Sequence, residues 1–193
     1  MAKKRQERFE MLRESSKARI EKAALELFAH NGYGHTSISK IAAAAGISKG
    51  LMYNYYDSKE ALLQAILQKG LDFGDSLLEG LPEDPKALLV FVVEASFQEV
   101  INNLEFWKLL TSLTFQEDVL KTFAPQFEQK KKEFIQLGTF TFQQLGHPDP
   151  EMQAMLFGAA MDGVFLHYIL SPNDYPLEEV KCLLIENFCK KYK

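Results

Sequence analysis

Apolar residues in the first third of the chain recur with the spacing of an α-helix. One stripe follows positions i, i+3, i+4, i+7 and i+8: Ile20, Ala23, Ala24, Leu27 and Phe28. This period predicts an amphipathic helix over roughly Lys17 to His30. The pair Asn31-Gly32 then ends the helix, because glycine is the preferred residue just after a helix C-terminus.

Two short helical segments follow. Thr36 reads as the N-cap of the first, which carries Ile38, Ile41, Ala42 and Ala45 and ends at Gly46. Ser48 reads as the N-cap of the second, over about Lys49 to Tyr55.

The rest of the chain also has helical periodicity. Asp57 or Ser58 caps a fourth, long helix that runs to about Gly80. The segment "ALLVFVVEA", Ala87 to Ala95, has the composition of a buried strand, but its apolar pattern continues too far for a typical strand. Alternation typical of strands is nearly absent, and most prolines stand where the pattern changes. We therefore expect an all-α fold.

Two short helices joined by a glycine turn and braced by a third are the layout of a helix-turn-helix. The second short helix would be the recognition helix, with its N-terminal residues at the base edges. Lys49 can reach a phosphate or a guanine edge, and Gly50 removes bulk where the backbone approaches the groove. Glycine costs a helix about 1 kcal/mol, which indicates that something other than stability selected it.

The neighbouring tyrosines and hydroxyl residues extend this hypothesis. Tyr53 and Tyr55 can place their rings on the groove wall and their hydroxyls on phosphates, whereas Tyr56 is expected to pack against the fourth helix. Helix N-termini favour phosphate, so the residues that begin the second and fourth helices are further candidates. Alternatively, the tyrosines only seal a small three-helix core. The predicted DNA-binding residues are Thr36, Ser37, Ser39, Ser48, Lys49, Gly50, Tyr53, Tyr55, Ser58 and Lys59.

Over residues 17–65 the sequence resembles the DNA-binding region of the tetracycline-repressor (TetR) family. The matching patterns are "A..LF...G" in the first helix, "T.I..IA..AGIS.G..Y.Y" across the two short helices, and "SKE.LL" at the start of the fourth. The resemblance implies an N-terminal three-helix DNA-binding domain and a C-terminal helical domain for ligand binding and dimerisation. It also implies a homodimer that binds a near-palindromic double-stranded DNA operator.

Charge divides the chain in the same place. Residues 1–60 hold eleven basic and seven acidic residues, a net charge of +4, whereas residues 61–193 have a net charge of −8. Such a split suggests that the first part meets a polyanion. We expect a DNA-binding domain over 1–60 and an effector-binding and dimerisation domain over 61–193. Lys3, Lys4, Arg5 and Arg8 form a basic arm that contacts the minor groove or phosphates, or is a disordered tail.

The second domain is rich in phenylalanine, and most of these rings belong to its core. The family resemblance implies that a subset lines a cavity for a small apolar or aromatic effector, since such cavities are mostly apolar. The residues expected in its wall are Phe106, Trp107, Phe127, Phe134, Met161 and Phe165.

Two C-terminal segments have the character of interface helices. Pro150 to Leu170 is apolar around nearly its whole circumference, so it is expected to be buried on more than one side. A second helix with one apolar stripe is expected after Pro176. These two helices from each of two subunits can form a two-fold interface. Alternatively, both helices only close the monomer. The expected interface residues are Met155, Leu156, Ala159, Gly163, Leu177, Val180, Leu184 and Phe188.

Other classes of protein are less compatible with the sequence. No apolar run indicates a membrane span or a secretion signal, which favours a cytoplasmic protein. No nucleophile motif, phosphate-binding glycine loop or metal-ligand spacing is present, so we expect no enzyme, no metal and no cofactor. Cys182 and Cys189 read as buried thiols, or as a redox switch across a dimer. A second hypothesis for the whole chain is a DNA-binding module whose C-terminal domain answers to a protein partner or to no ligand.

Overall fold

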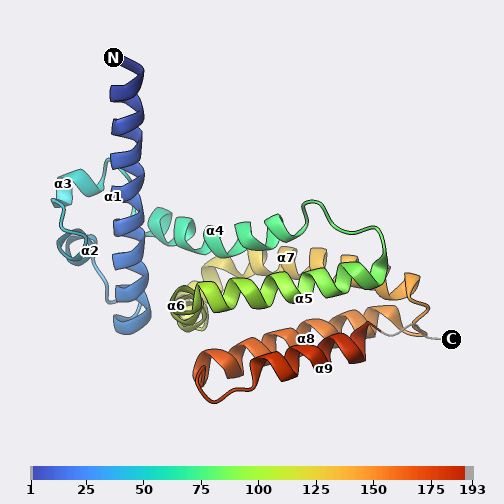
Figure 1. Cartoon of the computed structure of the whole chain (residues 1–193). Coiled ribbons are helices and arrows are strands. Elements are labelled where there is room, and N and C mark those ends of the chain that lie inside the picture. Colours follow the sequence, from blue (N-terminus) through green and yellow to red (C-terminus); the bar gives the residue numbers. More distant parts are fainter. Residues whose placement is uncertain (1, 190–193) are drawn as a thin grey trace. The chain divides into compact units, whose positions relative to one another are not determined.

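The computed structural model describes residues 2–189, and the side chains of residues 4–189. Within this range the chain forms helices and their connections, without a strand, as the sequence predicted (Figure 1). The helices are α1 (Ala2–Asn31), α2 (Ile38–Ala44), α3 (Lys49–Met52), α4 (Lys59–Leu77), α5 (Pro85–Asn102), α6 (Leu104–Thr114), α7 (Glu117–Gln144), α8 (Pro150–Leu170) and α9 (Leu177–Phe188).

The chain divides into two compact units. The first contains Met1–Asp72 and Leu109–Thr122, and the second contains Phe73–Lys108 and Phe123–Lys193. Helices α4, α6 and α7 therefore contribute to both units, and the division does not fall after residue 60 as expected. The physical reason is that α4 continues past residue 60 and buries an apolar stripe in the core of the first unit: Leu62, Leu63, Ile66 and Leu67.

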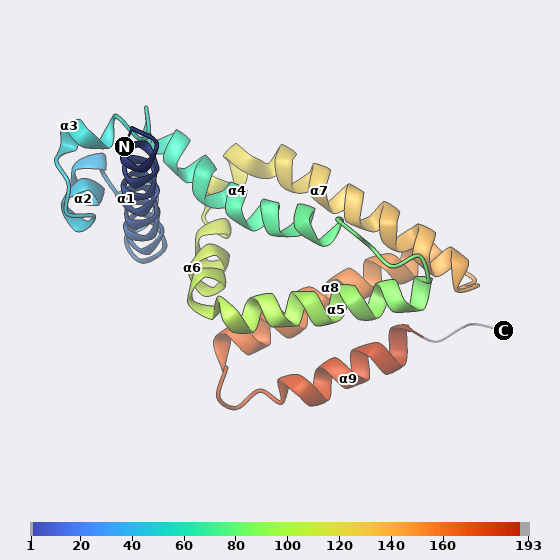
Figure 2. The ribbon, with the colours of Figure 1, turned by 45° about the horizontal axis from the view of Figure 1, so that its top comes forward.

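In the first unit α2 packs against α1, and α3 packs against α2 (Figure 2). Its core contains the predicted stripe of α1, with Ile20 and Phe28 fully buried, together with Ile41 of α2 and Met52 of α3. Helix α3 is shorter than expected, because it ends at Met52 rather than Tyr55.

Helix α1 begins at Ala2, about four turns earlier than the apolar stripe predicted. The side chains of residues 4–15 are exposed, so no core contact marks this part of the helix in the sequence. Lys4, Arg5 and Arg8 therefore lie on α1 itself rather than on a separate basic arm or tail, while the side chain of Lys3 lies outside the described residues.

The second unit has its own core, formed by α5, α7, α8 and α9. Helices α8 and α9 pack together, and α9 also packs on α5 (Figure 1). Pro85 and Pro150 stand in the first turns of α5 and α8, where proline is well tolerated. Pro125 differs from the expectation, because it lies inside α7 and removes one N–H from that helix.

Helix α8 is long and apolar enough to resemble a membrane-spanning helix by length and composition. Here part of its surface packs in the core of the second unit, where Ala154, Met161, Val164 and Ile169 are buried. A buried core helix has the same composition as a membrane span, and for that reason the composition alone does not place α8 in a bilayer.

Candidate functional site

The turn between α2 and α3 is fixed by local hydrogen bonds. Gly46 has φ of +69°, Gly46 N donates to Ala43 O at 3.1 Å, and Ile47 N donates to Ala42 O at 3.0 Å. These two bonds close the C-terminus of α2 in the manner of a Schellman motif, which needs a residue in the left-handed region. The glycine therefore sets the direction in which α3 starts.

Serine caps both short helices. The Ser48 hydroxyl accepts from Leu51 N at 3.1 Å, and the Ser37 hydroxyl accepts from Lys40 N at 3.3 Å. The cap of α3 is the one predicted, whereas the cap of α2 is Ser37 rather than Thr36. Both serines are exposed, so each hydroxyl stands at the accessible end of its helix.

Helix α3 presents a polar outer face. Lys49 and Gly50 are exposed, and no atom lies within 4 Å of the position of a Cβ at Gly50. Tyr53 is 46% exposed just beyond the helix, while Met52 is fully buried and anchors α3 to the core. Leu51 is also exposed, with 39% of its surface accessible, beside Lys49. An exposed leucine here is suited to contact with a thymine methyl group.

Thr36 is not part of this surface. It is buried, and its hydroxyl donates to Leu27 O at 3.2 Å and Gly32 O at 2.9 Å. These bonds tie the end of α1 to the start of α2. The predicted DNA-binding role of Thr36 is therefore wrong, because the side chain already satisfies backbone carbonyls inside the unit.

Lys59 also has internal partners. Its ammonium donates to Tyr33 O at 2.9 Å and lies 4.2 Å from the centroid of the Tyr33 ring. The Tyr33 hydroxyl in turn donates to Glu60 at 3.0 Å. Burial and this bond raise the pKa of Tyr33. The same bond helps to lower the pKa of Glu60, after the backbone hydrogen bond of Glu60 itself. The structure thus places Lys59 in a bridge between the α1–α2 turn and α4, rather than free at a phosphate site.

Ser58, the other predicted residue at the start of α4, is half-buried, and its hydroxyl accepts a hydrogen bond from Ala61 N at 3.0 Å.

A second internal network holds the segment after α3. The buried Tyr56 hydroxyl donates to the buried Glu21 carboxylate of α1, and Glu21 also pairs with Lys69 of α4. Burial, followed by the hydrogen bond to Glu21, raises the pKa of Tyr56. Tyr56 is therefore buried inside the unit and joins the end of the helix-turn-helix to α1.

Tyr55 is half-buried. Its side chain lines a groove of about 220 Å³ together with four residues of α1: Glu10, Arg13, Glu14 and Lys17. The groove contains two cationic and two anionic side chains, so it is not a simple anion site.

Sequence reasoning missed two contributors to this region. Lys40 is exposed on α2, next to the predicted and exposed Ser39, and donates to His35 O at 3.4 Å. A basic residue three positions after the Ser37 cap was a usable signal. Gln116, between α6 and α7, had no signal: its side-chain amide accepts from Tyr33 N at 2.7 Å and donates to Phe28 O at 2.8 Å.

Comparison with known proteins agrees with this geometry. The family model described as "Bacterial regulatory proteins, tetR family" matches residues 20–66, which contain the capped α2–α3 pair and its brace. Residues 20–66 therefore form a DNA-binding domain of the TetR type.

The curated relatives share mainly this part of the chain. The uncharacterized HTH-type transcriptional regulator YerO of Bacillus subtilis is 34% identical over 99 residues. The match covers 49% of this chain and 34% of YerO, so the similar region spans about a third of that relative.

Solved structures extend the likeness in fold to the second unit. NalD, the secondary repressor of the MexAB-OprM multidrug efflux pump in Pseudomonas aeruginosa, superposes with a TM-score of 0.72 at 24% identity. That match covers 91% of this chain and 94% of NalD. SmeT in its complex with triclosan superposes with a TM-score of 0.70 at 18% identity, covering 90% of both chains. At these identities the likeness shows the TetR fold alone.

The six predicted effector residues fall into separate groups. Phe106 and Trp107 are half-buried neighbours whose ring centroids are 5.5 Å apart. Met161 is buried in the core of the second unit, and Phe165 packs edge-to-face on Phe97 at 5.1 Å. Met161 and Phe165, which were predicted to line the effector cavity, therefore pack in the core of the second unit.

The other two predicted wall residues lie on α7. Phe127 is half-buried, whereas Phe134 is 40% exposed and approaches α4. A Cβ at Gly74 of α4 would lie 3.0 Å from the Phe134 ring, so a larger residue there would require a small shift of the ring.

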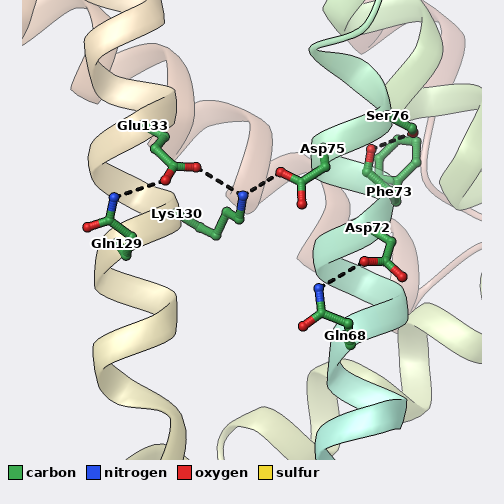
Figure 3. A network of polar contacts seen from close by, with 8 residues as sticks. All are labelled: Gln68, Asp72, Phe73, Asp75, Ser76, Gln129, Lys130 and Glu133. Atoms are coloured by element: carbon green, nitrogen blue, oxygen red, sulfur yellow. Dashed lines mark hydrogen bonds and ion pairs between the residues drawn. The ribbon is translucent and has the colours of Figure 1, made fainter.

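An ion-pair network joins α4 and α7 next to this contact (Figure 3). The Lys130 ammonium of α7 binds Asp75 of α4 and lies 3.0 Å from Glu133, which also accepts from Gln129 at 2.9 Å. The hydrogen bond to Asp75, followed by that to Glu133, raises the pKa of Lys130. Asp75 and Gly74 therefore connect α4 to α7 within the second unit.

The predicted interface residues are largely exposed on α8 but packed in the core on α9. On α8, Met155, Leu156 and Ala159 are exposed and Gly163 is half-buried, so this face is available to a partner. On α9 the predicted stripe instead packs into the core of its own unit: Leu177, Val180, Leu184 and Phe188. This corrects the expectation for α9, because its apolar stripe is used to close the monomer.

The cysteines differ from each other. Cys182 is exposed, whereas Cys189 is buried in the core and burial raises the pKa of its thiol. The expectation of two buried thiols is therefore correct only for Cys189.

Proposed function

We propose that this protein is a repressor that binds a near-palindromic operator as a homodimer and releases it when a small apolar or aromatic effector binds. The observation that carries the DNA-binding part is the exposed Lys49–Gly50 edge of α3, held by the Ser48 cap and the buried Met52. A short helix fixed at both ends presents base-reading atoms at small entropic cost. We place the protein in the cytoplasm and assign it no catalytic activity.

The dimer part rests on the exposed apolar face of α8. Met152, Leu156, Leu166 and Leu170 are large apolar residues with exposed fractions of 40% or more. A contiguous apolar surface of this kind is typical of a protein interface. A two-fold dimer would place two recognition helices about 34 Å apart, one turn of DNA.

The effector part rests on the half-buried aromatic residues of the second unit and on the relatives. NalD is a repressor of a multidrug efflux pump, and SmeT has been solved with triclosan. We infer that an effector bound by the second unit lowers operator affinity by favouring a state with poorer DNA contacts.

The test is a binding-site selection from random duplex DNA with the purified full chain. We expect a sequence with two related half-sites centred 10 to 10.5 base pairs apart, or a multiple of that spacing. Sedimentation of the protein with and without the selected DNA gives the stoichiometry. A selection that enriches no duplex at low ionic strength would refute the proposal, and enrichment of a single half-site by a monomer would refute the dimer.

A further inference from the structure

Four side chains of the second unit form what we call the Trp107 cluster: Phe73 of α4, Glu99 of α5, and Phe106 and Trp107 of α6. The Phe73 and Trp107 centroids are 5.8 Å apart at an interplanar angle of 74°, and Phe106 and Trp107 are 5.5 Å apart at 79°. Such edge-to-face pairs leave ring faces rich in π-electrons. All three aromatic residues are half-buried, so part of each ring stays accessible.

The carboxylate of the cluster is not neutralised. Glu99 accepts from Trp107 Nε1 at 3.3 Å and from Asn103 Nδ2 at 3.0 Å, and both donors are neutral. Within residues 4–189, no lysine, arginine or histidine forms an ion pair with Glu99. A half-buried carboxylate without a cation retains a negative potential at the edge of the indole ring.

The surrounding backbone and charges add to this potential. Glu99 lies in the last turn of α5, which ends at Asn102 and has no basic residue there. The C-terminus of a helix carries a partial negative charge and favours cations. By sequence, residues 73–108 and 123–193 hold nine basic and sixteen acidic residues, a net charge of −7. Each of these features disfavours an anionic ligand at the Trp107 cluster.

We propose that the Trp107 cluster binds an apolar organic cation. The ring faces of Phe106 and Trp107 would hold the cation by cation–π attraction, and Glu99 would supply the counter-charge. A neutral phenol or a fatty acid would make the apolar contacts, but it would lack the attraction of a cation to the ring faces and to Glu99. This inference rests on the proposed effector response, because it names the chemical class of that effector.

The structure offers a direct assay, because Trp107 is the only tryptophan in the chain. Tetraphenylphosphonium and tetraphenylborate have the same shape and opposite charge, so they separate charge recognition from apolar contact. We expect tetraphenylphosphonium to change Trp107 fluorescence with a saturable curve, and tetraphenylborate to bind at least about tenfold more weakly. Equal or tighter binding of tetraphenylborate would overturn the proposal.

Variants locate the site. Glu99→Gln keeps an acceptor for Trp107 Nε1 but removes the charge, and should weaken tetraphenylphosphonium about threefold to tenfold. Glu83→Gln is the matched control, because this exposed residue lies just before the other end of α5 and removes the same charge. Phe106→Leu, which removes a ring but keeps apolar volume, should also weaken the phosphonium. Circular dichroism verifies that each variant is folded. Equal effects of Glu99→Gln and Glu83→Gln would overturn the site.

The proposed function is tested separately. Titration of the selected DNA in the presence of saturating tetraphenylphosphonium measures the operator response. Saturable phosphonium binding without any change in DNA affinity would support the site and refute the effector response. Intact DNA binding with no phosphonium binding would refute the site alone.

Discussion

Lys59 of α4 and Tyr33 of the α1–α2 turn form a compact bridge: the ammonium donates to Tyr33 O at 2.9 Å and lies 4.2 Å from the ring centroid. A lysine at the start of a helix in a DNA-binding domain reads as a phosphate contact, but this one is satisfied inside the first unit. Lys49, by contrast, is exposed on α3. The two lysines should therefore respond differently to substitution.

We expect Lys49→Ala to reduce the slope of log K against log salt for the selected operator by about one, because one phosphate contact is lost. Lys59→Ala should leave this slope nearly unchanged and lower the free energy of unfolding by about 1–2 kcal/mol, through loss of a hydrogen bond and a cation–π contact. Salt titrations of DNA binding and urea unfolding measure the two effects. A reversed pattern would mean that Lys59 reaches the DNA.

Gln116 should stabilise the turn that precedes α2. Gln116→Met removes both bonds, leaving Tyr33 N and Phe28 O without this partner, and should lower the free energy of unfolding by about 1–3 kcal/mol. It should also weaken DNA binding, because the start of α2 loses its support. Gln136→Met is the control, since Gln136 is exposed on α7. Equal stability of the two variants in urea would show that the Gln116 bonds contribute nothing.

The buried tyrosines predict a loss of stability in alkali. The pKa of Tyr56 is raised in the folded state, whereas an unfolded tyrosine titrates near pH 10. Below about pH 10 the hydroxyl is protonated in both states and its contribution is fully present. Above that pH the unfolded chain ionises first, so the free energy of unfolding should fall as pH rises towards the folded pKa.

Urea unfolding between about pH 9 and pH 11 measures this dependence. Tyr56→Phe should be less stable at neutral pH, because Glu21 loses its donor, but its stability should fall less steeply with rising pH. The pKa of Tyr33 is also raised, by burial and by its hydrogen bond to Glu60, and Tyr33 should account for part of the remaining slope. An unchanged slope in Tyr56→Phe would show that this hydroxyl ionises equally in both states.

The exposed face of α8 predicts a variant that separates subunits. Leu156→Glu places a charge on an apolar face that is 57% exposed at this residue, and should shift a dimer towards single subunits without unfolding them. DNA affinity should fall at least about tenfold, because a monomer reads only one half-site. Sedimentation velocity measures the shift. Leu120→Glu is the matched control on another helix, and an equal response of both variants would argue against α8 as the interface.

The local sequence determined the helical class and the DNA-binding elements. Apolar spacing around Phe28, the Ser48 cap and Gly46 are short-range signals, because helix periodicity, capping and left-handed backbone act within about four residues. The same signals predicted α4 and α5. The unpacked first half of α1 was missed, since an exposed helix of charged residues has no apolar stripe to reveal it.

Only the tertiary structure decided which candidates are available to a partner. Thr36 and Lys59 have suitable chemistry and position in the sequence, but backbone carbonyls more than three residues away already bind them. The same holds for the apolar stripe of α9 and for the two hydrogen bonds of Gln116. The identity of an apolar or amide side chain does not specify which surface it contacts in the folded protein. Sequence pattern specifies the form of each helix, whereas long-range contacts determine which of its faces remain free to act.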